Sequence, residues 1–317
     1  MRVLITGVAG FIGTNLSLHY LEKRHKVYGI DNFDKYNSLD LKKFRLRILK
    51  KQKNFIFKKI DITDRDDLFK YFKNKKIDLI IHLAGQAGVR YSLLNPKKYI
   101  NNNIIGFLNI VFSAKKYNIK KIIYASSSSV YGDSKKFPSK ETDKLKQKNI
   151  YAVSKKLNEK IAEVYSKLTQ IKFIGLRFFT IYGEFGRTDM FLFKLFKSSF
   201  KKDIFKINNF GNHLRDFTYI KDVNEIVYKL SFKNLGKNEI FNICSNNPKN
   251  IFKIVKYFKK ENDVRVHLVN KHKADILKTH GDNSKLIKKI KFDNFTNINK
   301  EIFKIYDWYK RNKIYKM

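Results

Sequence analysis

Short apolar runs alternate with longer amphipathic stretches over the first 175 residues of the chain. The apolar runs have the length and composition of strands, and the stretches between them place apolar residues at helical spacing. An alternation of strands and helices predicts an α/β fold with a doubly wound parallel sheet. Strands are expected at residues 1–6, 27–30, 54–60, 77–82 and 121–125, and helices at 15–23, 64–73, 99–117 and 152–168.

The character of the chain changes after Ile174. A strand and turn at 176–183 lead into a glycine-bearing loop and then a helix at 190–200. These elements predict a second, smaller α/β domain that closes over the first and shapes a substrate site. We predict a nucleotide-binding domain at 1–175, to which segments near 217–245 return, and a substrate-binding domain made mainly of 176–317.

Three glycines mark the first turn between a strand and a helix. Gly7, Gly10 and Gly13 have the spacing GxxGxxG, and they lie where a dinucleotide-binding fingerprint is expected. Such glycines permit a tight turn and let the backbone approach a pyrophosphate at the helix N-terminus. Asp31 ends the second strand, 18 residues after Gly13. A carboxylate there accepts hydrogen bonds from ribose hydroxyls and repels a 2′-phosphate, which favours NAD over NADP.

Two further strand ends carry polar groups whose roles stay open. Asp61 follows the strand at 54–60 and either meets the adenine or caps the next helix. His82 lies in an apolar strand, where a histidine is more often part of the core than an acid or base. The small residues that follow it, Ala84 and Gly85, suit a close backbone approach to a cofactor.

Tyr151 and Lys155 stand four residues apart on a predicted helix. Positions i and i+4 share one face, so the phenol and the ammonium can point into the same space. A neighbouring cation favours the phenolate and lowers the pKa of a tyrosine, which makes it a general base for an alcohol proton. The alternative is an exposed helix with an ordinary Tyr and Lys. A serine run, 126–129, ends a parallel strand, where ligands bind in such sheets.

Composition limits the classes of function. The 317 residues are 43% hydrophobic and carry a net charge of +40, with lysines spread along the whole chain. We interpret this charge as compositional bias and not as a nucleic-acid-binding surface, because it forms neither a basic tail nor an arginine-rich stripe. The single cysteine, Cys244, excludes an intramolecular disulfide and a cysteine metal cluster, and no metal site is predicted. With no apolar stretch of spanning length and no signal peptide, a cytoplasmic protein without membrane insertion is expected.

The glycine triplet, the serine run before Val130, and Tyr151 with Lys155 resemble the extended short-chain dehydrogenase/reductase family over essentially the whole chain. The stretches 177–183 and 215–220 narrow the resemblance to its nucleotide-sugar branch. The stretches 87–92 and 186–190 look most like UDP-glucuronate 4-epimerases. The resemblance implies a Rossmann-type NAD-binding domain and an enzyme, an isomerase that converts UDP-glucuronate to UDP-galacturonate through a 4-keto intermediate in polysaccharide biosynthesis.

The resemblance also implies catalytic roles for three residues. Tyr151 takes the proton of the sugar 4-hydroxyl, and Ser127 hydrogen-bonds that hydroxyl. Lys155 lowers the pKa of Tyr151 and holds the nicotinamide ribose. Hydride passes to NAD and returns to the other face of the sugar, so the cofactor stays bound. Related dehydratases and decarboxylases carry acidic residues directly after this serine. Ser128 and Ser129 stand there in this chain, which disfavours elimination at C5 and C6.

Further binding roles follow from the resemblance. Arg187 either pairs with the glucuronate carboxylate through a bidentate fork, or is a loop charge or diphosphate ligand. Arg215 neutralises the diphosphate. Asn103 either lies near the nicotinamide as a buried polar group or makes a hydrogen bond between two helices. Residues 271–275 depart from the Pro-Gly-Asp sequence of relatives. The predicted cofactor contacts are Gly7, Gly10, Phe11, Ile12, Gly13, Asp31, Asn32, Asp61, Ile62, Leu83, Ala84, Asn103, Tyr151 and Lys155, and the predicted substrate contacts are Ser127, Ser128, Thr180, Arg187, Arg215 and Asp275.

Three alternatives to UDP-glucuronate epimerization stay open. In the first, the chain is a 4-epimerase of UDP-glucose or UDP-N-acetylglucosamine. In the second, it is a related nucleotide-sugar epimerase or dehydratase. In the third, it is a nucleic-acid-associated protein that keeps the fold, and this alternative predicts steeply salt-dependent binding of DNA or RNA. The family generally forms homodimers, here through the helices at 99–117 and 152–168.

Overall fold

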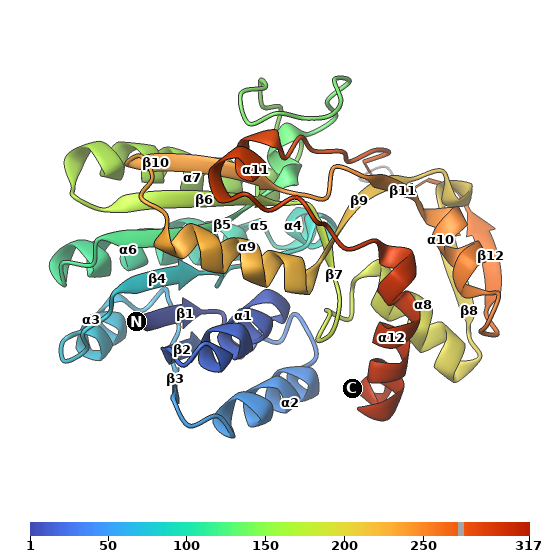
Figure 1. The fold of residues 1–317 in the computed structure, drawn as a ribbon, viewed down its shortest axis with the longest axis horizontal. Helices are drawn as coiled ribbons and strands as arrows, with labels where there is room; N and C mark the ends of the chain where they lie inside the picture. The colour runs from blue at the N-terminus through green and yellow to red at the C-terminus, as the bar shows by residue number, and fades with distance from the viewer. Residues whose placement is uncertain (272–275) are drawn as a thin grey trace.

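A seven-stranded parallel sheet lies at the centre of the computed structural model, which describes residues 1–271 and 276–317 (Figure 1). The strand order is β10-β6-β5-β4-β1-β2-β3, and every neighbouring pair is parallel. This order confirms the predicted doubly wound α/β fold of Rossmann type, with its switch point between β1 and β4. The strands are β1 (Arg2–Thr6), β2 (Lys26–Asp31), β3 (Phe55–Lys59), β4 (Leu79–His82), β5 (Lys121–Ser127), β6 (Lys172–Phe178) and β10 (Asn238–Ile243).

Helices cover both faces of the sheet because successive strand residues point to opposite sides. In β1, Val3 and Ile5 join one hydrophobic cluster and Leu4 joins the other. The first cluster packs under α1 (Phe11–Glu22), α2 (Leu39–Lys50) and α9 (Ile220–Phe232), and the second under α3 (Arg65–Phe72), α6 (Gly106–Lys116) and α7 (Ile150–Leu168).

The helix predicted at 99–117 is divided into segments. A short helix α5 (Pro96–Tyr99) runs into a π-helical segment η1 (Ile100–Ile105), which continues as α6. A π-helical turn inside a helix is often found at a functional site. Asn103 lies in this turn and is fully buried. A separate helix α4 (Val89–Leu94) precedes α5.

The C-terminal part of the chain builds a smaller region at the carboxyl end of the large sheet (Figure 1). It contains a three-stranded sheet and a two-stranded parallel sheet, β8 with β12. The strands β8, β11 and β12 were not predicted from the sequence. Its elements are β7 (Thr180–Tyr182), β9 (Leu214–Tyr219), β11 (Pro248–Asn250), β8 (Ile204–Asn208), β12 (Arg265–Val269), α8 (Phe191–Lys201), α10 (Ile251–Phe258) and α12 (Ile298–Arg311). Helix α11 (Ser284–Ile290) returns to the large sheet, where it packs against β10 and α9 (Figure 1).

The large sheet extends past residue 175, since β6 runs to Phe178 and β10 forms the edge beside it. The division into two domains at residue 175 stays a prediction. Among the helices in the described parts of the chain, none is both long enough and apolar enough to cross a membrane. The cytoplasmic location also stays a prediction.

Candidate active site

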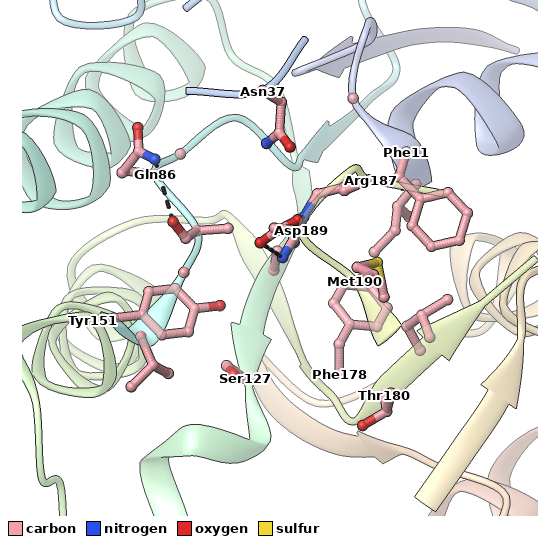
Figure 2. A pocket seen from close by; sticks show the side chains of 18 of the residues that line it. Phe11, Asn37, Gln86, Ser127, Tyr151, Phe178, Thr180, Arg187, Asp189 and Met190 are labelled. Carbon is pink, nitrogen blue, oxygen red and sulfur yellow. Dashed lines mark hydrogen bonds and ion pairs between the residues drawn. The ribbon is translucent and has the colours of Figure 1, made fainter. Parts of the chain in front are cut away.

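A cavity of about 760 Å³ opens at the carboxyl ends of the sheet strands (Figure 2). This is the edge at which open α/β sheets bind ligands. The glycine-rich turn lines one end of the cavity, and Ser127 and Tyr151 line its middle. The far end is lined by residues of α8, β8 and β9 from the smaller region. The fold therefore brings the predicted nucleotide site and the predicted substrate site into one continuous space.

The turn between β1 and α1 is built to approach another backbone closely. Gly7 has a φ of +70°, and a Cβ atom there would lie 2.8 Å from the backbone nitrogen of Ala84. A Cβ atom on Gly13 would lie 2.3 Å from the carbonyl oxygen of Gly7. The N-cap of α1 is Gly10, with no capping side chain and no acidic residue in the first turn. This open helix N-terminus fits the pyrophosphate of a dinucleotide.

Asp31 lies at the end of β2 beside this turn and is buried. Its carboxylate accepts hydrogen bonds from the backbone N–H groups of Ala9, at 3.1 Å, and Phe33, at 2.8 Å. The ammonium of Lys42 lies 3.8 Å from the same carboxylate. These contacts hold the carboxylate at the cavity wall, where it fits a ribose hydroxyl. Lys42 was not predicted from the sequence to line this wall.

Asp61 turns toward its own loop. Its carboxylate accepts hydrogen bonds from the side-chain amide of Asn32, at 2.9 Å, and from the N–H and hydroxyl of Thr63, at 2.9 and 2.7 Å. Burial alone would raise the pKa of Asp61, but these donors outweigh burial and lower it. The cavity is lined by Ile60, Ile62 and Asn32 near this point. Asp61 does not cap the next helix, because the N-cap of α3 is Asp64. The Asp61 carboxylate instead holds its own loop, and the adenine contact stays a prediction.

Helix α7 carries Tyr151 and Lys155 into the cavity wall. The side chain of Asn149 caps the helix by accepting from the N–H of Ala152 at 2.9 Å. The ammonium of Lys155 is buried and donates to the carbonyl of Ala125 at 2.9 Å. Burial lowers the pKa of Lys155 to about 8. The i, i+4 spacing thus brings both side chains to the same cavity, as expected.

The pKa of Tyr151 differs from the expectation based on sequence. Burial raises it above the ordinary value, while a hydrogen bond from Ser127 and the charge of Arg187 act to lower it. We expected Lys155 to be the lowering group, but its ammonium is directed to the carbonyl of Ala125. The cation that acts on the phenol in this structure comes instead from the loop between β7 and α8.

Ser127 and its neighbours end β5 at the cavity. The Ser127 hydroxyl accepts from the N–H of Ser129 and lies 3.2 Å from its hydroxyl. Ser128, Ser129 and Thr180 also line the cavity. Figure 2 shows Ser127 between the phenol of Tyr151 and Thr180. The serine run therefore supplies several hydroxyl groups to one wall and no acidic group.

Asn103 joins three segments behind this wall. Its side-chain oxygen accepts from the N–H of Gln86 at 2.7 Å, and its amide donates to the Gln86 carbonyl and the Ser154 hydroxyl at 3.1 and 2.9 Å. A Cβ atom on Gly85 would lie 2.8 Å from the Asn103 oxygen, which explains the glycine at that position. His82 is a core residue, since its ring is buried and hydrogen-bonded to Thr6 at 2.9 Å.

Arg187 lines the cavity, but its guanidinium already forms a bidentate ion pair with Asp189. Its Nε and Nη2 atoms each lie 2.9 Å from one carboxylate oxygen of Asp189. The hydroxyl of Tyr36 also donates to Asp189, at 3.3 Å. Figure 2 shows this ion pair and the phenol of Tyr151 directed into the same space. The sequence analysis missed Asp189 and Tyr36, although Asp189 stands only two residues after Arg187.

Arg215 lines the far end of the cavity and donates to backbone carbonyls. Its guanidinium lies 2.9 Å from the oxygen of Leu214, 3.0 Å from that of Leu277 and 2.6 Å from that of Ile276. Lys194 and Lys206 line the same end and supply positive charge near it, and the buried His213 lies beside them in the cavity wall. Asp275, a predicted substrate contact, lies outside the described residues. Within the described residues, no group of His, Cys, Asp and Glu side chains suits a metal ion.

Comparisons with known proteins agree on the family. Residues 3–244 match the NAD-dependent epimerase/dehydratase family. The chain is 36% identical to the UDP-glucuronate 4-epimerase of Thermodesulfobacterium geofontis, over 98% of this chain and 96% of that protein. It is also 36% identical to protein CapI of Staphylococcus aureus, over 98% of both chains.

Solved structures give the same picture. The crystal structure of UDP-glucuronic acid 4-epimerase from Bacillus cereus, in complex with UDP-glucuronic acid and NAD, superposes with a TM-score of 0.92. The two sequences are 29% identical, and the alignment covers 98% of this chain and 100% of the other. The fold that surrounds the cavity of this chain is therefore the fold that, in the Bacillus cereus enzyme, binds NAD and UDP-glucuronic acid.

Proposed function

The chain belongs to the NAD-dependent epimerase/dehydratase family, and on that premise we propose that it interconverts UDP-glucuronate and UDP-galacturonate by epimerization at C4 of the sugar. One observation carries the proposal: Tyr151, Ser127 and Arg187 reach one cavity that also begins at an open, glycine-capped helix N-terminus. Two of the relatives reported above, from Thermodesulfobacterium geofontis and Bacillus cereus, are UDP-glucuronate 4-epimerases.

The glycine turn, Asp31 and Lys155 are the residues that we assign to NAD. The N-terminus of α1 takes the pyrophosphate, and Asp31 takes the ribose hydroxyls. Bound NAD supplies a reversible acceptor for the hydride at C4 of the sugar. Lys155 lies one helical turn after Tyr151, lines the same cavity and is anchored on the carbonyl of Ala125.

Tyr151 acts as the proton acceptor and later as the proton donor for the oxygen at C4. A base that works in both directions suits an epimerase, because the two sugars differ little in energy and the same proton must return. Ser127 donates a hydrogen bond to the phenolate, which holds it toward the sugar oxygen. The width of the cavity gives the 4-keto sugar room to turn and present its other face.

The wall near the sugar contains hydroxyl groups and one arginine. Ser128 and Thr180 are the donors that we assign to the glucuronate carboxylate, together with Arg187. Ser128 and Ser129 cannot act as acid or base near neutral pH. The reaction therefore ends at epimerization, without elimination at C5 or C6.

The ion pair between Arg187 and Asp189 favours a second candidate. Because Asp189 occupies one edge of the guanidinium, the cavity is closer to neutral there than a free arginine would make it. A neutral sugar, as in UDP-glucose or UDP-N-acetylglucosamine, would fit such a wall. The second candidate is thus a 4-epimerase of one of these neutral nucleotide sugars.

The test is to incubate the purified protein with UDP-glucuronate, without added cofactor, and to follow the anomeric proton by NMR. Appearance of UDP-galacturonate, moving to a stable mixture, supports the proposed reaction and retention of NAD. No change, with turnover of UDP-glucose or UDP-N-acetylglucosamine in parallel tubes, supports the second candidate. The Tyr151→Phe variant is the blank that separates enzymatic from spontaneous change.

We also propose that two copies associate through α7 and the helix beside it. Exposed apolar side chains on one surface mark an interaction site, and those on α7 recur at helical spacing. They are Val153, Leu157, Val164 and Leu168 on α7 and Ile100 and Ile105 on η1. Leu157→Glu is expected to halve the mass measured by sedimentation, whereas Phe232→Glu, at the exposed last residue of α9, should leave it unchanged.

A further inference from the structure

Asp189 and Arg187 form a bidentate ion pair in the cavity. Two parallel N–H···O contacts of 2.9 Å join them, and each side chain is about one-third exposed to the cavity (31%). A bidentate pair fixes the plane of the guanidinium as well as its distance. An arginine has a second edge, formed by Nη1 and Nη2, that remains on the far side of this pair.

The loop that carries the pair is held by the nucleotide-binding half of the molecule. Arg45, fully buried in α2, donates to the carbonyl of Ala9 at 3.0 Å and to the carbonyl of Gly186 at 3.0 Å. The amide of Asn15 donates to the carbonyl of Glu184 at 3.1 Å. These bonds fix the backbone directly before Arg187 and so hold the ion pair at the cavity wall.

The pair also lies within electrostatic range of the catalytic phenol. Arg187 acts to lower the pKa of Tyr151, and Asp189 acts to raise it. Three other groups surround that phenol: Lys155 on the same helix, Ser127 at the end of β5, and Tyr99, whose ring centroid lies 6.1 Å away. The Asp189 carboxylate thus cancels part of the positive field at the position of the sugar oxygen on C4.

That cancellation matters for the 4-keto intermediate of the proposed reaction. The intermediate is a β-keto acid. It loses CO2 when the C5–C6 bond breaks, the electron pair moves into the C4–C5 bond, and the C4 oxygen becomes an enolate. Protonation at C5 and return of the hydride then give a UDP-pentose. An uncompensated cation near the C4 oxygen stabilises the enolate and favours this loss.

We propose that Asp189 is a positioning residue that keeps this enzyme from decarboxylating its intermediate. It holds Arg187 with one edge toward the substrate carboxylate and neutralises the charge that Arg187 would otherwise present to the enolate oxygen. The inference rests on the proposed function, because it concerns an intermediate of that reaction. It assigns a role to a residue that does not itself contact the reacting atoms.

The experiment compares Asp189→Asn with the wild-type enzyme on UDP-glucuronate, with products separated by chromatography. The substitution keeps the shape of the side chain and removes its charge. We expect the UDP-pentose fraction of the product to rise at least tenfold, and the acid limb of the kcat–pH profile to move to lower pH, because the group that raises the pKa of Tyr151 is gone.

Two control variants isolate the charge from the fold. Asp189→Glu keeps the charge and is expected to form no more pentose than the wild type. Glu184→Gln alters a carboxylate in the same loop that contacts Tyr219 and Lys221, and it should keep the wild-type products and pH profile. If Asp189→Asn does not fold, Asp189→Ser is measured by the same two readouts.

The outcomes separate this inference from the proposed function. A wild-type enzyme that does not epimerise UDP-glucuronate overturns the proposed function. A wild-type enzyme that epimerises it, with an Asp189→Asn variant that forms only hexuronate and keeps the wild-type pH profile, overturns the role of Asp189 alone. Equal pentose from Asp189→Glu and Asp189→Asn also overturns it, because charge would then be irrelevant.

Discussion

The guanidinium of Arg177 and the carboxylate of Glu159 form a buried bidentate ion pair, with N–O distances of 2.8 and 2.9 Å. Glu159 lies one helical turn after Lys155 on α7, and Arg177 lies on β6. The hydroxyl of Ser126 donates to the same carboxylate at 2.7 Å. The pair thus joins α7 to β6, and the Ser126 hydrogen bond joins it to β5, the strand that presents Ser127.

Removal of one partner of this pair is expected to destabilise the fold strongly. Glu159→Gln leaves the charge of Arg177 buried without its counter-ion, so the free energy of unfolding should fall by about 3–5 kcal/mol. Chemical denaturation measures this change. Glu163→Gln on the same helix is the control, because its carboxylate pairs with Lys160 at the surface, and its stability should match the wild type. Equal stability of both variants would contradict the prediction.

Removal of the Tyr151 hydroxyl is expected to abolish turnover while the fold and cofactor stay intact. Tyr151→Phe should lower kcat by about 10²- to 10⁴-fold, the usual contribution of a positioned general base. The measurement is the initial rate on UDP-glucuronate, together with the NAD content of the purified protein. Tyr165→Phe, a partly exposed tyrosine on the same helix, should keep the wild-type rate. A large loss in that control would point to a structural effect of the helix.

Asp31 and Asp61 are expected to differ in their effect on cofactor binding. Asp31→Ser removes the carboxylate held at the cavity wall, so NAD affinity should fall about 10- to 100-fold and the preference over NADP should shrink. Asp61→Asn should change little, because that carboxylate is engaged by Asn32 and Thr63. Cofactor content after dialysis, measured by chromatography, decides between them. A loss of NAD from Asp61→Asn would restore the adenine contact predicted from sequence.

His82 is expected to make the protein less stable in mild acid. Burial and the charge of Lys155 lower the pKa of His82 to about 3 in the folded state. The unfolded chain binds this proton below pH ~6.5, so stability falls as the pH falls from there toward 3. Between pH 7.5 and pH 5 the wild type should lose about 2 kcal/mol more than His82→Asn.

The measurement for His82 is the free energy of unfolding of both proteins at the two pH values. The other acid-sensitive groups are common to both proteins and cancel in the comparison. His267→Asn, on the exposed strand β12, should follow the wild type at both pH values. A parallel pH dependence of wild type and His82→Asn would show that the buried imidazole does not limit acid stability.

The sequence by itself determined the fold class and indicated the proposed catalytic residues, because both predictions depend on local spacing. Alternating strands and helices predict the parallel sheet, and glycines at the first turn predict the helix N-terminus that faces the cavity. The i, i+4 spacing of Tyr151 and Lys155 places both side chains on one helix face. Ser127 follows from its place at the end of a parallel strand.

Only the tertiary structure decided which charged groups pair. Arg187 forms an ion pair with Asp189. Arg215 donates to the backbone carbonyls of Ile276 and Leu277, and Lys155 donates to the carbonyl of Ala125. Each partner of an arginine or lysine is selected by packing between segments distant in sequence, or by the turn of one loop, and a chain with 68 basic residues offers many alternatives. Local spacing therefore predicts the proposed catalytic groups, whereas the three-dimensional packing decides which charged groups lie near each of them.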